Sequence, residues 1–231
     1  MKKTTVLILS IICGATITFA QNYPSKSLEE FHFSVLTEKS RMGGQYDYSS
    51  IQGSPFLNNE FVKGEVTSTS NTIVSDVPLR YNIYADEIEY EEKDKKTFYL
   101  DKSTVKNIKI GGSEFIYKAY LLNNKLGRSY FEVLLRGKAT LLKQYRVNFE
   151  DAKPAKAYED PSPARFKTSK PDFYIAFGDA EAKRISGAKQ LSEELFSDKG
   201  TEIAGFIKKN KLKTGDQEDI VRIVQFYNEG Q

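Results

Sequence analysis

The chain has 231 residues, 13% of them aromatic, and a formal net charge of +3 at pH 7. With one histidine and one cysteine, it cannot supply the usual ligands of a zinc site, and a catalytic triad would have to combine a serine with that single histidine. Its mixed, near-neutral charge gives no electrostatic case for binding nucleic acid. We therefore expect no metal, no cofactor, no catalytic residues and no nucleic-acid partner.

Residues 1–20 have the pattern of a secretory signal peptide. A pair of lysines precedes a short apolar run, and the small residue Ala20 marks the cleavage point. The run is too short to span a bilayer comfortably, so an uncleaved anchor is only the alternative. The cysteine in this segment follows an isoleucine instead of a small residue, so lipid attachment is not expected. Cleavage lowers the charge to +1, and no later stretch is apolar enough for a membrane helix.

Residues 21–60 are predicted to be a lead-in of one short helix and a loop. Ser27 is a good helix N-cap, and Glu30 stands three residues later as in a capping box. The following stretch is rich in Gly, Ser, Tyr and Asn, which indicates a loop.

The stretch from Val77 to Glu91 predicts the β-hairpin around which the sheet is organised. Apolar and polar residues alternate along it with period two, so one face is apolar and the other polar. A tight turn at Ala85-Asp86 would match the two apolar faces and set the register. The expected pairs are Ile83 with Ile88, Tyr81 with Tyr90, and Arg80 with Glu91.

Residues 61–150 are predicted to form an antiparallel β domain with about nine strands, mostly joined by short turns. Gly111-Gly112 is a two-residue hairpin signal that would place Ile108 opposite Phe115, and Gly64 suggests a bulge or a close backbone approach. We expect an α+β fold built on an antiparallel β-meander, as a rolled sheet, a sandwich or a partly open barrel. In the last expected strand, the residues assigned to one face are Leu141, Tyr145, Val147 and Phe149.

The remaining residues are predicted to form a Pro-rich segment and a C-terminal region. Residues 151–171 read as a linker or a strap along the surface, which Tyr158 and Phe166 could attach to the sheet. Residues 172–231 would form a further hairpin around Gly178-Asp179 and then short amphipathic helices. The expected helices cover residues 188–196, 199–209 and 216–228.

Several runs of the chain resemble a group of exported Bacteroidetes proteins of unknown function. The resemblance spans most of the mature chain. It implies a signal peptide and a cell-envelope or secreted setting, and it implies no catalytic residues. The runs that carry it are residues 53–58, 77–84, 131–134, 141–143, 206–213 and Tyr227-Asn228.

One polar face of the hairpin is the best binding face that the sequence offers. An aromatic ring beside polar groups can form a sugar- or peptide-binding face, and ordinary sheet packing is the competing interpretation. Neighbouring glutamates on a strand could also serve glycosidase chemistry or bind calcium, against a strand face whose charges meet Arg80 and lysines. A hydrolase based on His32 is a further alternative without a nucleophile motif to support it. The predicted ligand-binding residues are Arg80, Asn82, Tyr84, Glu87 and Glu89.

A basic run near the C-terminus could contact an anionic membrane surface or an acidic partner, or simply be a solvated helix end. It consists of Lys208, Lys209, Lys211 and Lys213. Taken together, the sequence predicts an exported, non-catalytic protein of the periplasm, outer membrane or exterior that binds another envelope component. A small-ligand binder for a glycan, peptide or lipid is one alternative, and a carboxylate-based hydrolase is another.

Overall fold

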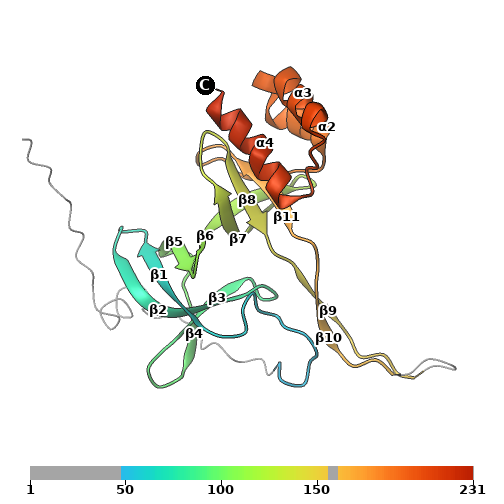
Figure 1. The fold of residues 1–231 in the computed structure, drawn as a ribbon. Coiled ribbons are helices and arrows are strands. Elements are labelled where there is room, and N and C mark those ends of the chain that lie inside the picture. Colours follow the sequence, from blue (N-terminus) through green and yellow to red (C-terminus); the bar gives the residue numbers. More distant parts are fainter. Residues whose placement is uncertain (1–47, 156–160, 231) are drawn as a thin grey trace, which may run out of the picture.

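The computed structural model describes residues 48–155 and 161–230 (Figure 1). The predicted signal peptide, the short helix expected at Ser27, His32 and Tyr158 lie outside these residues. The strands are β1 Val62–Ser68, β2 Ile73–Asn82, β3 Glu87–Glu91, β4 Thr97–Tyr99, β5 Val105–Ile110, β6 Ser113–Leu122, β7 Lys125–Leu135, β8 Thr140–Gln144, β9 Val147–Glu150, β10 Arg165–Thr168, β11 Asp172–Ala176 and β12 Ala182–Arg184. The helices are α2 Ala188–Gln190, the π-helical turn η1 Leu191–Leu195, the 3-10 turn η2 Ser197–Lys199, α3 Gly200–Asn210 and α4 Gln217–Glu229.

The protein is mostly β-sheet with a few short helices, as expected. Ten strands form one sheet in the order β12-β11-β8-β7-β6-β5-β1-β2-β3-β4. β12 also pairs with β6, in parallel, which closes β6, β7, β8, β11 and β12 into a small barrel. The other strand pairs among the described residues are antiparallel. The remaining strands of the sheet curl away from the barrel (Figure 1).

Three apolar clusters fill the molecule. The curled sheet encloses one of them, and the barrel encloses a second, which includes Phe131, Leu142 and Tyr174. The third lies between the barrel wall and the helices, where Leu141 and Phe173 share a cluster with residues of α3 and α4. The helices therefore cover the outside of the barrel, and side chains fill its interior.

The two hairpins with sequence-predicted registers have different outcomes. The β5–β6 register is confirmed, with Ile108 opposite Phe115. The β2–β3 register is wrong by two residues, because Tyr81 lies opposite Ile88 and Arg80 lies opposite Glu89. The turn is longer than expected and covers residues 83–86. A shift of two residues keeps every side chain on its predicted face, so the expected apolar face still packs in the core.

Gly64 fulfils both expectations made for it. The β1–β2 register shifts between Gly64 and Val66, which marks a bulge-like irregularity. A Cβ atom at Gly64 would lie 2.2 Å from the Lys109 carbonyl oxygen and 2.6 Å from Leu79 Cδ1. Only glycine fits at this close approach of the neighbouring strands β1 and β5 without displacing the backbone.

β9 and β10 form a separate two-stranded arm that extends away from the body (Figure 1). The single face predicted over residues 139–150 is wrong, because β8 ends at Gln144 and the chain leaves the barrel there. Leu141 packs beneath the helices, whereas Tyr145 and Val147 pack against the core of the curled sheet. Within the expected Pro-rich strap, residues 165–168 form β10, and Phe166, which the sequence suggested could attach the strap to the sheet, is buried.

The C-terminal helices form where the sequence predicts them. α2 and η1 cover 188–195, and α3 and α4 lie within one residue of the expected ranges. The Asp216 carboxylate accepts hydrogen bonds from the backbone N–H groups of Glu218 and Asp219, which caps α4. β11 pairs with β8, so this region shares the main sheet. Of the helices in the described part of the chain, none is long and apolar enough to cross a membrane.

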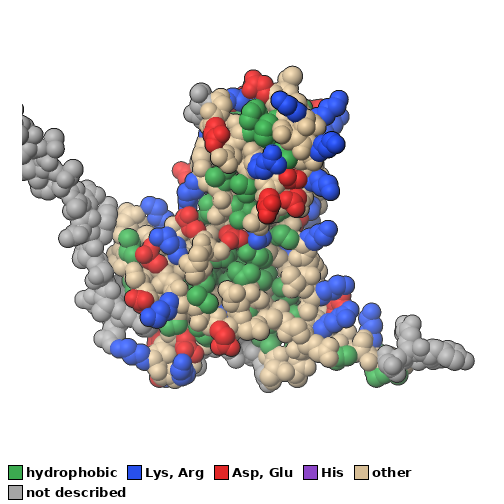
Figure 2. All heavy atoms as spheres, in the orientation of Figure 1, with side chains coloured by type: hydrophobic (Ala, Val, Ile, Leu, Met, Phe, Trp, Pro, Cys, Tyr) green, Lys and Arg blue, Asp and Glu red, His purple; other side chains and the backbone are tan. Residues whose placement is uncertain are grey.

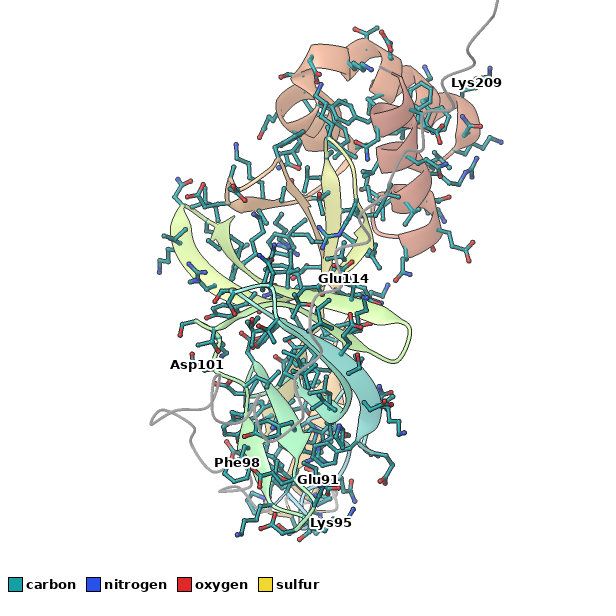
Figure 3. The ribbon with its side chains drawn as sticks, turned by 90° about the vertical axis from the view of Figure 1, so that its left-hand side faces the viewer. Glu91, Lys95, Phe98, Asp101, Glu114 and Lys209 are labelled. Atoms are coloured by element: carbon teal, nitrogen blue, oxygen red, sulfur yellow. The ribbon has the colours of Figure 1, made fainter. Side chains whose placement is uncertain are left out.

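The edge strand of the main sheet, β4, is short and lies beside charged residues. It spans three residues, and the turn before it contains five charged side chains in succession, residues 92–96. Figure 3 shows Glu91 and Lys95 together at this end of the molecule, with Lys209 at the opposite end among the helices. Charged side chains and short length are common means of protecting an edge from pairing with other chains.

Candidate functional site: the aromatic root of the β9–β10 arm

Three of the five predicted ligand-binding residues form a buried network with one another. Arg80 Nε and Nη2 donate to Glu89 Oε2 at 3.1 and 2.6 Å, and Asn82 Nδ2 donates to Glu89 Oε1 at 3.2 Å. Glu89 is 2% exposed. Buried charges are tolerated when they are paired and hydrogen-bonded in this way. The polar groups of these residues therefore already have partners within the protein.

The lead-in covers this face of the hairpin. Leu57 N donates to Tyr81 O at 2.9 Å, which fixes residues 55–57 beside β2. The guanidinium of Arg80 lies 3.7 Å from the ring centre of Phe56 and 4.3 Å from that of Phe61. Arg80 thus lies between two aromatic rings, where cation–π attraction adds to its ion pair.

The other glutamates of β3 each have a cation of their own. Glu87 pairs with Lys102 at 3.0 Å, and Glu91 pairs with Lys95 at 2.8 Å. In the residues that the structure describes, no group of three or more His, Cys, Asp or Glu side chains is placed to hold a metal ion. Each carboxylate of β3 thus has a cationic partner within the protein.

Tyr84 is the predicted residue that remains at the surface. It is 48% exposed and lies in the β2–β3 turn. The Asn82 side-chain oxygen accepts a hydrogen bond from Ala85 N at 3.0 Å, and the N–H groups of Ile83 and Tyr84 both donate to Pro55 O. These bonds hold the turn, so the ring is displayed from a fixed backbone.

Asp86 attaches the same turn to β7. Its Oδ1 accepts from the Tyr81 hydroxyl at 2.8 Å, from the Ser129 hydroxyl at 3.1 Å and from Tyr130 N at 3.2 Å. Its φ of 52° lies in the left-handed region, which aspartate and asparagine tolerate better than most residues. Burial raises the pKa of the Asp86 carboxyl, although these hydrogen bonds and Lys102 oppose the shift.

The raised pKa of Asp86 predicts a pH-dependent contribution to stability. The folded protein holds this proton more tightly than the unfolded chain, whose aspartate pKa is about 3.9. The contribution is fully present below that value and is lost as the pH rises through the higher folded pKa. The free energy of unfolding of the wild type, relative to Asp86→Asn, should therefore fall as the pH is raised over this range.

Urea unfolding of both proteins at a series of pH values measures this difference. The exposed Asp94 is a control of opposite sign, because hydrogen bonds from Lys96 lower the pKa of its carboxyl. The wild type relative to Asp94→Asn should gain stability as the pH rises. A difference between wild type and Asp86→Asn that stays constant or rises with pH would contradict the prediction.

Around Tyr84, five aromatic rings form what we call the arm-root cluster. The Tyr84 ring lies 5.1 Å from that of Phe166 and 6.3 Å from that of Phe149, and the last two lie 5.6 Å apart. Phe149 is 37% exposed, whereas Phe166 is 6% exposed and forms the base of the cluster. The cluster consists of Tyr48, Phe56, Tyr84, Phe149 and Phe166.

Backbone pairing brings these rings together. Phe149 lies directly opposite Phe166 in the β9–β10 ladder. On the other side of β10, Gln52 N donates to Ala164 O and Phe166 N donates to Gln52 O. Gly53, with φ of 79°, permits this approach, since a Cβ there would lie 2.4 Å from Phe166 O. The sequence predicted that Phe166 would contact the sheet but did not indicate Phe149 as a site residue.

The opposite face of the arm is polar and mainly basic. Arg165 and Lys167 both pair with Glu150, at 2.6 and 3.4 Å. Outside the two strands, Lys153 and Lys170 are exposed as well. Figure 2 shows basic side chains along the right-hand margin of the molecule, from the helices down to the arm. The arm therefore has an aromatic face and a face of positive charge.

The four lysines of the predicted basic run lie elsewhere. Lys208 and Lys209 are in the last turn of α3, and Lys211 and Lys213 follow it. All four are exposed and, among the described residues, have no ion-pair partner. Cations at this end of a helix also interact favourably with its dipole, so their position is explained without a ligand.

Two hollows occur on the surface outside the arm. One of about 540 Å³ lies between η1, η2 and the start of α3, and one of about 370 Å³ lies between the β6–β7 turn and β12. Polar and charged residues contribute most of the lining of the first.

Comparisons with protein-family models, with curated proteins and with solved structures each found no match.

Proposed function

We propose that this protein is an exported, non-catalytic binding protein that attaches to another protein of the cell envelope through the arm-root cluster. One observation carries the proposal. Three large hydrophobic side chains are exposed in the described residues, and two of them, Tyr84 and Phe149, are neighbours in this cluster. Aromatic side chains on a fixed backbone are typical of the central residues of protein interfaces.

The other predicted functions have less support. A small-ligand binder with its site inside the rolled sheet would need an internal cavity, but large side chains fill the barrel. A carboxylate-based hydrolase would need free acids, but Glu89 is buried against Arg80 and Glu87 is paired with Lys102. Attachment to a membrane surface through Lys208 and its neighbours would rest on the positive charge of these lysines alone, and the helix dipole already accounts for cations at this position.

Photo-crosslinking from inside the cluster tests the proposal. Replacing Tyr84 with p-benzoylphenylalanine keeps an aromatic ring at the site and adds a photoreactive group. Illumination of native envelopes should give one discrete adduct, which mass spectrometry identifies, and the mature chain in it should begin at Gln21.

Leu126 provides the matched control. It is the third exposed large hydrophobic residue, at 67%, and lies near the β6–β7 turn away from the arm. The same photoreactive residue at position 126 should give no such adduct, and Phe149→Ser should abolish the adduct formed from position 84. Equal labelling from positions 84 and 126, or no protein adduct from position 84, would overturn the proposal.

A further inference from the structure

Within the part of the chain that the structure describes, β9 is the strand of the arm that has an unpaired edge. β10 pairs with β9 on one side and with Gln52 on the other. On the outer side of β9, no backbone partner is found in residues 48–155 or 161–230. None of these residues therefore occupies the main-chain groups on that side.

The N–H and C=O of Phe149 point toward this open edge. The Phe166 N–H is directed at Gln52 O, at 2.7 Å, and so away from β9. The opposed residues Phe149 and Phe166 therefore form a non-hydrogen-bonded pair, in which the main-chain groups of both residues point outward. Ser169 N donates to Arg146 O at 3.0 Å, which is the bonded pair that the alternation requires three residues before Phe149. The regular ladder ends at Glu150, and beyond it Lys153 and Ser162 donate to each other's carbonyl oxygens.

β9 lacks most of the features that protect exposed edges. Natural edge strands are commonly short, charged with lysine, interrupted by proline or a bulge, or covered. β4 follows this rule, with three residues beside a charged turn. β9 is also short, with the sequence Val-Asn-Phe-Glu, but it contains no lysine, proline or bulge, and the exposed ring of Phe149 lies beside the outward-pointing main-chain groups of the same residue.

On the basis of the proposed function, we infer that the partner contributes an extended segment that pairs with β9 as an additional strand. Main-chain hydrogen bonds to Phe149 would hold it, and alternate side chains would lie against Phe149 and Tyr84. The charge of the arm determines the composition of this segment. The described part of the arm carries more basic than acidic side chains, so the partner's segment should be acidic. It should also have apolar residues at every second position, because alternate side chains would face Phe149 and Tyr84. The charged residues are Lys153, Arg165, Lys167 and Lys170 against Glu150 and Asp151.

A library of 12-residue peptides displayed on phage, selected on the full mature protein, supplies the probe. The selected sequences should be acidic with alternating apolar residues. One synthetic peptide is then made in two backbone-methylated forms, with N-methyl groups on either the odd or the even residues. A strand that pairs along one edge uses only half of its N–H groups, so one form should bind at least tenfold more weakly and the other should bind like the parent.

Two pairs of protein variants examine the edge itself. Val147 lies two residues before Phe149 in the same strand, so its N–H also points outward. Val147→Pro removes that N–H and should weaken peptide binding at least tenfold, whereas Val147→Ala should leave it unchanged. Phe149→Lys should weaken binding similarly, and Leu126→Lys should not. Because the methylated peptides are tested on the unmodified protein, the result does not depend on the folding of Val147→Pro.

The outcomes separate this inference from the proposed function. Equal binding of both methylated forms, or wild-type binding by Val147→Pro, would overturn strand pairing while crosslinking from position 84 could still succeed. A dimer of the mature protein in light scattering that Phe149→Lys dissociates would also overturn it, because the edge would then bind a second copy. Failure to select any peptide that requires Phe149 would overturn it as well. Loss of the position-84 adduct would instead reject the proposed function.

Discussion

Replacing Arg80 with alanine is expected to lower the free energy of unfolding by about 3 to 5 kcal/mol, which is the usual cost of leaving a buried charge unpaired. Arg80 supplies two of the three hydrogen bonds that the buried Glu89 carboxylate accepts. Its guanidinium also fills the space between the rings of Phe56 and Phe61. The substitution therefore removes a charge partner and a packing surface together.

Urea unfolding monitored by circular dichroism measures this loss. Lys95→Ala is the matched control, because it breaks an ion pair with a glutamate of the same strand, Glu91, at an exposed position, and should leave stability unchanged within error. Arg80→Lys should fall between the two, since an ammonium cannot reproduce the forked geometry. A loss for Arg80→Ala no larger than that for Lys95→Ala would show that Glu89 does not need its partner.

Gly64→Ala is expected to destabilise the protein by about 2 to 4 kcal/mol, since overpacking against backbone cannot be relieved by a side-chain rotation. The added methyl group would lie 2.2 Å from the Lys109 carbonyl oxygen in the neighbouring strand β5. β1 joins β5 to β2, so any separation at this point weakens the connection between the barrel and the curled half of the sheet.

Gly112→Ala is the control for glycine replacement as such. A Cβ there meets nothing within 4 Å, so its effect should stay within about 0.5 kcal/mol. If Gly64→Ala does not accumulate as folded protein, the yields of folded Gly64→Ala and Gly112→Ala under the same conditions compare the same two positions. Equal stabilities at the two positions would contradict the close approach of β1 and β5.

Features that depend on neighbouring residues could be predicted from the sequence. A two-residue turn at Gly111-Gly112 places Ile110 opposite Ser113, and this sets the register of β5 with β6. The C-terminal helices form from their own apolar periodicity and from the Asp216 cap. The β2–β3 register could not be predicted, because the turn also bonds through Asp86 to Ser129 and Tyr130, over forty residues away.

The candidate site could be predicted only in part for the same reason. The sequence indicated Tyr84 as a site residue, and the structure places it at the surface. It also placed Arg80, Asn82 and Glu89 together, which is correct, but the strand pattern does not reveal that residues 55–61 cover them. The burial of this polar face comes from a segment that is adjacent to it only in the folded chain.

The sequence by itself determined a β-rich chain with short C-terminal helices, because strand alternation and helix periodicity are local properties of side-chain order. Only the tertiary structure decided that β12 pairs with β6 to close a barrel, and that β9 leaves that barrel to form an arm. It also decided the arm-root cluster, whose rings come from four separate segments of the chain. Such contacts depend on which distant surfaces bury each other, and the order of residues within one segment does not encode that choice.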